Sequence, residues 1–237
     1  MIEVKNLTKN YSGKVVLKDI SFSIPHGQVV TIIGRSGVGK SVLLKSLIGL
    51  IKPDSGSIYL DNQLINSMNF HQLQKTRSKI GMVFQFGALF DSMTVGENIS
   101  LALNKLTKLD SEQIKDRLKD SLDSVEMSDS EDLMPSELSG GMKKRIGIAR
   151  AIAIKPNYLF YDEPTTGLDP VMTDSINRLI YKFHNTEKVT SIIVTHDMKT
   201  LQFVSNKVIM LHEGNIIFND STDMLFKSND KFIRYFV

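Results

Sequence analysis

The sequence of 237 residues contains no cysteine. Disulfide bonds and cysteine nucleophiles are therefore excluded, and the absence agrees with a reducing compartment. No apolar run approaches the about 20 residues that a membrane-spanning helix needs, and residues 1–5 lack the apolar core of a signal peptide. We therefore expect a protein that faces the cytosol and reaches a membrane only through a partner.

The chain also lacks a strong charge imbalance, internal repeats and low-complexity segments. Its formal net charge is +3, and its lysines and arginines are interspersed with acidic residues. Nucleic-acid-binding proteins usually carry a clustered basic surface, so we predict no nucleic-acid partner. The hydrophobic content of 41% and the length are typical of one large domain or one domain with an inserted subdomain.

Residues 34–41, Gly-Arg-Ser-Gly-Val-Gly-Lys-Ser, match the phosphate-binding loop pattern G-x-x-x-x-G-K-[ST]. The β-branched run at 29–33 predicts a strand before the loop, and apolar residues at helical spacing predict a helix over 40–50. Glycines let backbone N–H groups approach phosphate oxygens, while the lysine adds charge and the serine can bind Mg²⁺. A glycine-rich turn that binds nothing is the alternative. The predicted nucleotide contacts are Gly34, Arg35, Ser36, Gly37, Val38, Gly39, Lys40, Ser41 and Val42.

Polar residues follow three further apolar runs that read as buried strands. Asp162 and Glu163 follow one of them, and strand alternation would point the two carboxylates in different directions. Asp162 could then serve Mg²⁺ while Glu163 accepts a proton from water. Gln85 and His196 follow the other two runs, at strand ends where open α/β sheets bind ligands. A solvated glutamine and a structural histidine are the alternatives.

The segment Ser139-Gly140-Gly141 precedes an apolar helical pattern that Pro156 stops. Ser139 is a natural N-cap, but two glycines at a helix start cost about 1 kcal/mol each relative to alanine. Close approach of an anion to bare N–H groups would compensate, and a flexible cap is the alternative. Tyr11 lies in a polar turn, where its ring could stack on a purine or simply pack.

Residues 86–134 change in character and predict an inserted helical subdomain. The apolar segment at 86–90 could be a buried hinge or an exposed docking surface, and the spacing does not decide between them. The C-terminal residues 222–237 predict a helical piece that ends in several apolar side chains. We expect this tail to dock against its own subunit or against another one.

Six features occur in the order in which one known family carries them: the loop at 34–41, Gln85, residues 138–141, the pair Asp162 and Glu163, Asp169, and His196. Together they resemble the nucleotide-binding subunit of ATP-binding cassette (ABC) transporters, over essentially the whole chain. The resemblance implies an α/β fold: a P-loop NTPase core with an antiparallel β subdomain and an inserted α-helical subdomain. It implies a single ABC ATPase domain over 1–237, with these parts: core and β subdomain at 1–85 and 156–220, helical subdomain at 86–155, tail at 221–237.

The resemblance also implies Mg²⁺-dependent hydrolysis of ATP. The implied roles are these: Glu163 as general base, His196 on the γ-phosphate, Gln85 as the Q-loop residue, Tyr11 stacked on adenine, and Ser41, Gln85 and Asp162 at the metal. It further implies a head-to-tail homodimer that holds two ATP molecules. Ser139, Gly140 and Gly141 would bind the γ-phosphate held by the Lys40 loop of a second copy, and Asp169 would lie at the interface.

Within the family, the chain is similar to the ATPase of bacterial Mla-type or Mce-associated phospholipid transporters. The similarity rests on residues 34–44, 86–90, 141–145 and 161–170, and Met142 stands where the family commonly has glutamine. It implies a membrane permease that receives the helical subdomain near residues 86–90, a substrate-binding Mce-domain protein and a small accessory protein. The implied location is peripheral, at the cytoplasmic face of the inner membrane.

Three other functions are compatible with parts of the pattern. An importer ATPase for an amino acid or a metal keeps the class and changes the cargo. A soluble ABC ATPase of DNA repair or translation would favour tandem cassettes, a long coiled-coil insertion or basic arms, and the sequence has none of these. A nucleotide-binding module that never hydrolyses is disfavoured by Glu163 and His196.

Overall fold

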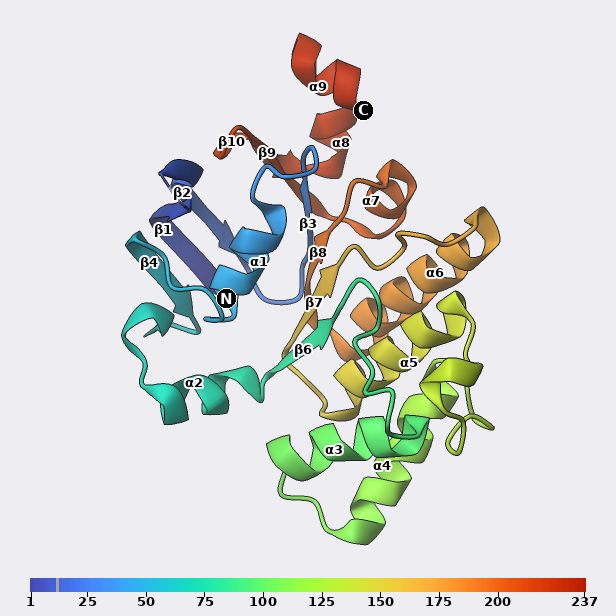
Figure 1. Ribbon diagram of the computed structural model, residues 1–237. Coiled ribbons are helices and arrows are strands. Elements are labelled where there is room, and N and C mark those ends of the chain that lie inside the picture. The colour runs from blue at the N-terminus through green and yellow to red at the C-terminus, as the bar shows by residue number, and fades with distance from the viewer. Residues whose placement is uncertain (12) are drawn as a thin grey trace.

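The computed structural model describes residues 1–11 and 13–237, which form two β-sheets with helices packed around them (Figure 1). In the larger sheet the strand order is β10-β9-β3-β8-β7-β6. Its strands are β3 (Val29–Ile33), β6 (Ile80–Val83), β7 (Tyr158–Asp162), β8 (Thr190–Val194), β9 (Lys207–His212) and β10 (Asn215–Ser221). Neighbouring strands run parallel except β9 and β10. The expected α/β core is confirmed.

The smaller sheet is antiparallel, with the strand order β2-β1-β4-β5. Its strands are β1 (Ile2–Tyr11), β2 (Lys14–Ile24), β4 (Ser55–Leu60) and β5 (Gln63–Leu64). Both β1 and β2 are long, although each contains polar residues of the kind that form turns. Asn6 and Asp19 have left-handed φ angles of 49° and 52° inside these strands, and the register between β1 and β2 shifts after Val4. Polar residues that suggested turns therefore form irregularities within paired strands.

Alternate side chains of the larger sheet enter two different cores, as strand geometry requires. Tyr158 and Phe160 on β7 pack with α1 (Lys40–Leu47) and the smaller sheet. Leu159 and Tyr161, which alternate with them, pack with α5 (Gly140–Ala153) and α6 (Pro170–Glu187). In Figure 1, α1 lies between the smaller sheet and β3. The larger sheet is thus covered on both faces, and its parallel strands end at one common edge.

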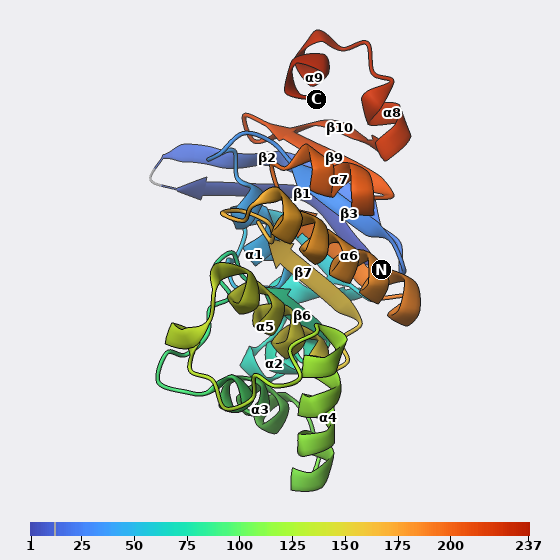
Figure 2. The same cartoon turned by 90° about the vertical axis from the view of Figure 1, so that its right-hand side faces the viewer.

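The helical part consists of α3 (Val95–Leu106), α4 (Ser111–Ser124) and α5, and it lies at the end of the molecule remote from the C-terminal helices (Figures 1 and 2). Thr94 and Asp110 each form a capping box with the residue three positions later, which fixes where α3 and α4 begin. The remaining short elements include α2 (Phe70–Arg77), α7 (Met198–Val204) and the 3₁₀ turns η1 (Ile65–Ser67) and η2 (Pro135–Glu137).

The tail forms two short helices, α8 (Thr222–Phe226) and α9 (Lys231–Phe236), where the sequence predicted one helical piece. Asp230 begins the second helix because its carboxylate accepts hydrogen bonds from the N–H groups of Phe232 and Ile233. Ile233 is buried, and the ring of Phe232 lies 4.1 Å from that of His212 on β9. The tail therefore docks on its own subunit.

Within the described ranges, 1–11 and 13–237, we find no helix with the combination of length and hydrophobicity that crossing a bilayer requires.

Candidate functional site

The loop at 34–41 joins β3 to α1, and its glycines are required by the space around it. Gly34 has a φ of 150°, and a Cβ there would lie 2.4 Å from the carbonyl oxygen of Leu211. Gly39 has a φ of 105°, and a Cβ there would lie 2.9 Å from the carbonyl oxygen of Val16. Both positions exclude any other residue, so the backbone itself lines the space above the loop.

Lys40 is buried at the start of α1, and its ammonium group turns back into the loop. Its Nζ donates to the carbonyl oxygen of Gly34 at 2.8 Å and to that of Arg35 at 3.2 Å. Burial lowers the pKa of Lys40, while the carboxylates of Glu163 and Asp162 act in the opposite direction. A phosphate in the loop would give this ammonium a charged partner in place of two neutral carbonyls.

Ser41 and Asp162 meet across the loop. The Ser41 hydroxyl donates to Oδ1 of Asp162 at 3.2 Å. Burial raises the pKa of Asp162, and the hydrogen bond from Ser41 opposes this shift. A hydroxyl and a carboxylate that converge beside a phosphate loop are the oxygen donors that Mg²⁺ takes in nucleotide sites, so these residues fit the metal.

Glu163 follows β7 directly and has a left-handed φ of 51°. The strand ends at Asp162, so this turn of the backbone, rather than the strand alternation assumed from the sequence, separates the two carboxylates. Oε2 of Glu163 accepts from the Thr166 hydroxyl at 3.0 Å and lies 2.9 Å from Nδ1 of His196. Its Oε1 lies 4.0 Å from Nζ of Lys40. The left-handed backbone conformation is strained for a residue other than glycine, and such strain often occurs at functional sites.

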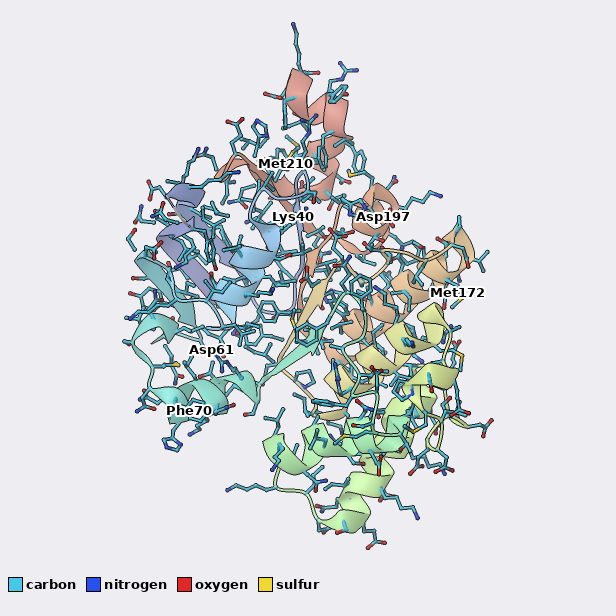
Figure 3. All side chains as sticks on the ribbon, in the orientation of Figure 1. Lys40, Asp61, Phe70, Met172, Asp197 and Met210 are labelled. Atoms are coloured by element: carbon cyan, nitrogen blue, oxygen red, sulfur yellow. The ribbon has the colours of Figure 1, made fainter. Side chains whose placement is uncertain are left out.

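An open cleft of about 570 Å³ lies above the loop at the carboxyl ends of the parallel strands. It is lined by Val16, Ser36, Gly37, Gly39, Lys40, Ser41, Val42, Gln85, Glu163 and His196. The structure therefore brings together the phosphate loop and all three residues predicted to be catalytic. In Figure 3, Lys40 lies near the centre of the molecule, between the smaller sheet and the ends of these strands.

Ser139, Gly140 and Gly141 lie outside this cleft, at the start of α5. The Ser139 hydroxyl accepts from the N–H of Met142 at 3.3 Å, which confirms it as the N-cap. A Cβ at Gly140 would meet no described atom within 4 Å, whereas one at Gly141 would lie 2.0 Å from Cε of Met172. The second glycine thus lies against the flexible end of the Met172 side chain, which can move aside, and the first faces open space.

Asp169 lies beside this segment, outside the cleft. Its carboxylate caps α6 by accepting from the N–H of Met172 at 2.9 Å. Met172 appears at the edge of the molecule in Figure 3, well separated from Lys40. One copy of the chain therefore does not bring the glycine pair to its own phosphate loop.

Tyr11 is the last residue of β1 and is partly exposed, whereas the sequence suggested a turn between strands. The ammonium of Lys9 lies 5.3 Å from the centre of its ring. Among the described residues that line the cleft, the smaller sheet contributes Val16 from β2 and not Tyr11. Stacking of Tyr11 on a base remains a prediction.

Three residues near the site were not predicted from the sequence. Val16 lines the cleft, Thr166 donates to Glu163, and the buried Lys144 of α5 donates to the backbone carbonyls of Gln85 and Glu163. Lys144 carried a signal, because it falls on the helical stripe that also contains Ile148 and Ala151. A lysine on an apolar helix face indicates either a buried cation or an error in the assigned face.

A family model described as ABC transporter matches residues 17–166. The chain belongs to this family. It is an ATPase that binds ATP with Mg²⁺, and the sequence-based predictions of the fold, the reaction and these cofactors are confirmed.

Among curated relatives, the methionine import ATP-binding protein MetN of Legionella pneumophila (strain Lens) is 37% identical over 234 residues, which are 99% of this chain and 68% of the relative. The probable ribonucleotide transport ATP-binding protein mkl of Mycobacterium leprae is also 37% identical, over 100% of this chain and 68% of the relative. The chloroplastic protein TRIGALACTOSYLDIACYLGLYCEROL 3 of Arabidopsis thaliana is 36% identical, over 100% of this chain and 73% of the relative. These names do not agree on a cargo.

A solved structure with closely similar architecture is the dimeric, post-hydrolysis ATP-binding cassette MJ0796 bound to ADP and phosphate. It superimposes with a TM-score of 0.87 at 33% identity, over 93% of this chain and 98% of the other. That cassette was captured after hydrolysis and as a dimer.

Proposed function

We propose that this chain is the ATP-hydrolysing subunit that powers a membrane permease for lipids. The observation that carries the permease is an exposed apolar groove between the nucleotide core and the helical part. It is lined by Ile48, Leu50, Ile80, Met82, Phe84, Ala88, Phe90, Ala102, Leu106 and Ile154, together with Gln74, Arg77, Gly81, Arg150 and Ala151. An exposed surface that gathers so many apolar side chains is typical of a protein contact.

Ala88 and Phe90 of the segment at 86–90 line this groove, and the aromatic rings of the segment are exposed rather than buried. Phe90 is 53% exposed and Phe86 is 78% exposed, which supports a docking surface over a buried hinge. Arg150 of α5 donates to the carbonyl oxygens of Gly87 and Ala88 at 2.7 and 2.6 Å and fixes the backbone beneath the exposed rings. In this proposal, residues 1–85 and 156–220 form the nucleotide core with its β subdomain, residues 86–155 the helical subdomain, and residues 221–237 the tail.

For the hydrolytic step we propose that Glu163 accepts the proton of the attacking water. Its contacts with Thr166 and His196 fix the orientation of the carboxylate, and His196 uses Nδ1 for this bond and leaves Nε2 for the γ-phosphate. The loop N–H groups and Lys40 hold the phosphates. Ser41, Gln85 and Asp162 would hold Mg²⁺, which would neutralise charge on the phosphate oxygens.

The second half of the site comes from another copy of the chain. Gly140 faces open space at the N-terminal end of α5, where N–H groups and the helix dipole favour an anion. We propose that Ser139, Gly140 and Gly141 close over the γ-phosphate in the loop of a second copy, with Asp169 at the interface. The dimeric form of the similar cassette supports this arrangement.

A lipid cargo is supported by the similarity of residues 34–44, 86–90, 141–145 and 161–170 to Mla-type or Mce-associated ATPases. The name of the Arabidopsis relative, which is that of a glycolipid, supports it as well. The name of the Legionella relative favours an amino acid importer instead. The proposed location is peripheral, on the cytoplasmic face of the membrane that holds the permease. An Mce-domain protein and a small accessory protein are the further partners that we propose.

The test is affinity purification of the tagged chain from detergent-solubilised membranes of its source, followed by mass spectrometry of copurified proteins and lipids. We expect an integral membrane permease, an Mce-domain protein and phospholipid in the complex. Recovery without an integral membrane protein contradicts the transport function. A permease without bound lipid, together with a binding protein for an amino acid or a metal, contradicts the cargo alone.

The groove is tested in the same experiment with two matched variants. Phe90→Glu introduces a charge in the groove, and Tyr181→Glu introduces one at a similarly exposed aromatic residue on α6, outside the groove (50% exposed). We expect Phe90→Glu to lose the permease and to keep ATP turnover, and Tyr181→Glu to keep both. Retention of the permease by Phe90→Glu would show that the groove is not the docking surface.

A further inference from the structure

Lys144 is a buried cation in α5, the helix that begins with Ser139 and Gly140. Its side chain is only about 4% exposed. Nζ donates to the carbonyl oxygen of Gln85, at the carboxyl side of β6, and to the carbonyl oxygen of Glu163 at 3.1 Å. One ammonium thus joins three parts of the proposed site: the helix of the glycine pair, the Q-loop residue and the catalytic carboxylate.

Packing alone does not account for a lysine at this position. Removing an ammonium from water is costly, and burial lowers the pKa of Lys144 to about 8 although Glu163 and Asp162 act in the opposite direction. A methionine of similar length would fill the same space without that cost. The ammonium group therefore has a use that methionine cannot supply, which is to donate hydrogen bonds to two backbone carbonyl oxygens.

The same face of α5 contacts the segment after β6 along its length. One turn beyond Lys144, a Cβ at Gly147 would lie 3.3 Å from Cα of Gly87. One turn further, Arg150 donates to the carbonyl oxygens of Gly87 and Ala88. Lys144 is the member of this row that also reaches Glu163, the residue directly after β7, so α5 cannot rotate or slide relative to Glu163 without breaking that hydrogen bond.

We propose that Lys144 is a positioning residue that couples the orientation of α5 to that of Glu163 and Gln85. The proposal rests on the function proposed above for Glu163 and for the start of α5. When Ser139 and Gly140 engage a phosphate, the displacement of α5 acts directly on two backbone carbonyls of the hydrolytic site. Lys144 itself donates to backbone oxygens and takes no part in proton transfer.

The chain offers a matched control in the adjacent Lys143. Lys143 lies on the same turn of α5 and is half-buried, and its side chain makes no hydrogen bond or ion pair with any residue in the described ranges. The variants are Lys144→Met, which keeps length and removes the donors, Lys144→Arg, which keeps charge and donors, and Lys143→Met. Equilibrium binding of MgATP, steady-state turnover and thermal unfolding are measured for each.

We expect Lys144→Met to lower kcat about tenfold to a hundredfold, as misplaced catalytic groups do, with KM and MgATP affinity within about twofold of the parent. Lys144→Arg is expected to recover kcat to within about threefold, and Lys143→Met to resemble the parent. If Lys144→Met does not fold, Lys144→Leu, which also lacks donors, replaces it under the same criteria. The proposal is overturned by unchanged kcat in Lys144→Met, by an equal loss in Lys143→Met, or by no recovery with Lys144→Arg.

Hydrogen exchange separates this proposal from that for Glu163. Amides of residues 84–90 should lose protection in Lys144→Met and keep it in Lys143→Met, whatever the role of Glu163. If Glu163→Gln retains normal turnover, the catalytic assignment fails and the exchange result still stands. If protection in Lys144→Met is unchanged, the coupling fails even when Glu163 is the base.

Discussion

The phosphate loop and the start of α5 use similar parts in different ways. Each places glycines at the N-terminal end of a helix, where N–H groups favour an anion. Around the loop, Lys40, Ser41 and Glu163 all have partners within the same chain. At the start of α5, Gly140 faces open space. The difference supports the proposal that a single chain supplies the phosphate loop with its surrounding residues and that a second copy uses the start of α5.

The largest effect is expected from Glu163→Gln, which keeps the shape of the side chain and removes the base. A general base contributes about 10²- to 10⁴-fold, so turnover should fall by that factor while MgATP still binds. Phosphate release and equilibrium nucleotide binding measure the two quantities. Normal turnover in this variant would mean that Glu163 is not the catalytic base of the cleft around the phosphate loop.

Lys40→Ala removes the charge from the loop and should weaken ATP binding about 10- to 100-fold, which is the scale of a hydrogen bond to a charged group. Lys52→Ala, at an exposed lysine outside the cleft, is the control and should bind as the parent does. Isothermal titration with MgATP distinguishes them. Equal affinity for both variants would show that the ammonium of Lys40 does not serve the phosphates.

The smallest effect concerns Asp169, which caps α6 within its own chain. Asp169→Ala should lower the free energy of unfolding by about 1 kcal/mol, a shift in Tm of about 2–4 °C. Asp169→Asn keeps the cap and should unfold as the parent does. If Asp169→Asn nevertheless lowers turnover, the charge acts beyond its own helix, as an interface role predicts. Unchanged Tm in Asp169→Ala would contradict the cap.

The sequence was sufficient for the core of the molecule because its signals there are local. The loop at 34–41 is one continuous motif, and the strands that precede Gln85, Glu163 and His196 end at the same edge of a parallel sheet. Motif and topology together therefore predicted residues that converge in the structure. The fold, the ATPase reaction and the use of ATP and Mg²⁺ were expected from the resemblance to ABC ATPases and are confirmed.

The features that were not predicted depend on contacts between distant segments. The contact between Gly141 and Met172 joins two helices, and the hydrogen bonds of Lys144 reach the segments that follow β6 and β7. The left-handed turn at Glu163 also has no local marker, because a glutamate is an unusual residue for that conformation. The length of β1 and β2 has no clear local marker either, since polar residues inside paired strands look like turn residues in a sequence.

The shared site is tested most directly by mixing two inactive variants. Lys40→Ala lacks a working loop, whereas Ser139→Arg should bind MgATP normally in its own loop and block closure over the loop of a second copy. At an ATP concentration near the Kd of the parent loop, each alone should be nearly inactive. In an equal mixture about half of the dimers are mixed, and each mixed dimer contains one complete site, so turnover should return to about a quarter of the parent value. A Ser139→Arg protein as active as the parent, or a mixture as inactive as its components, would contradict the shared site.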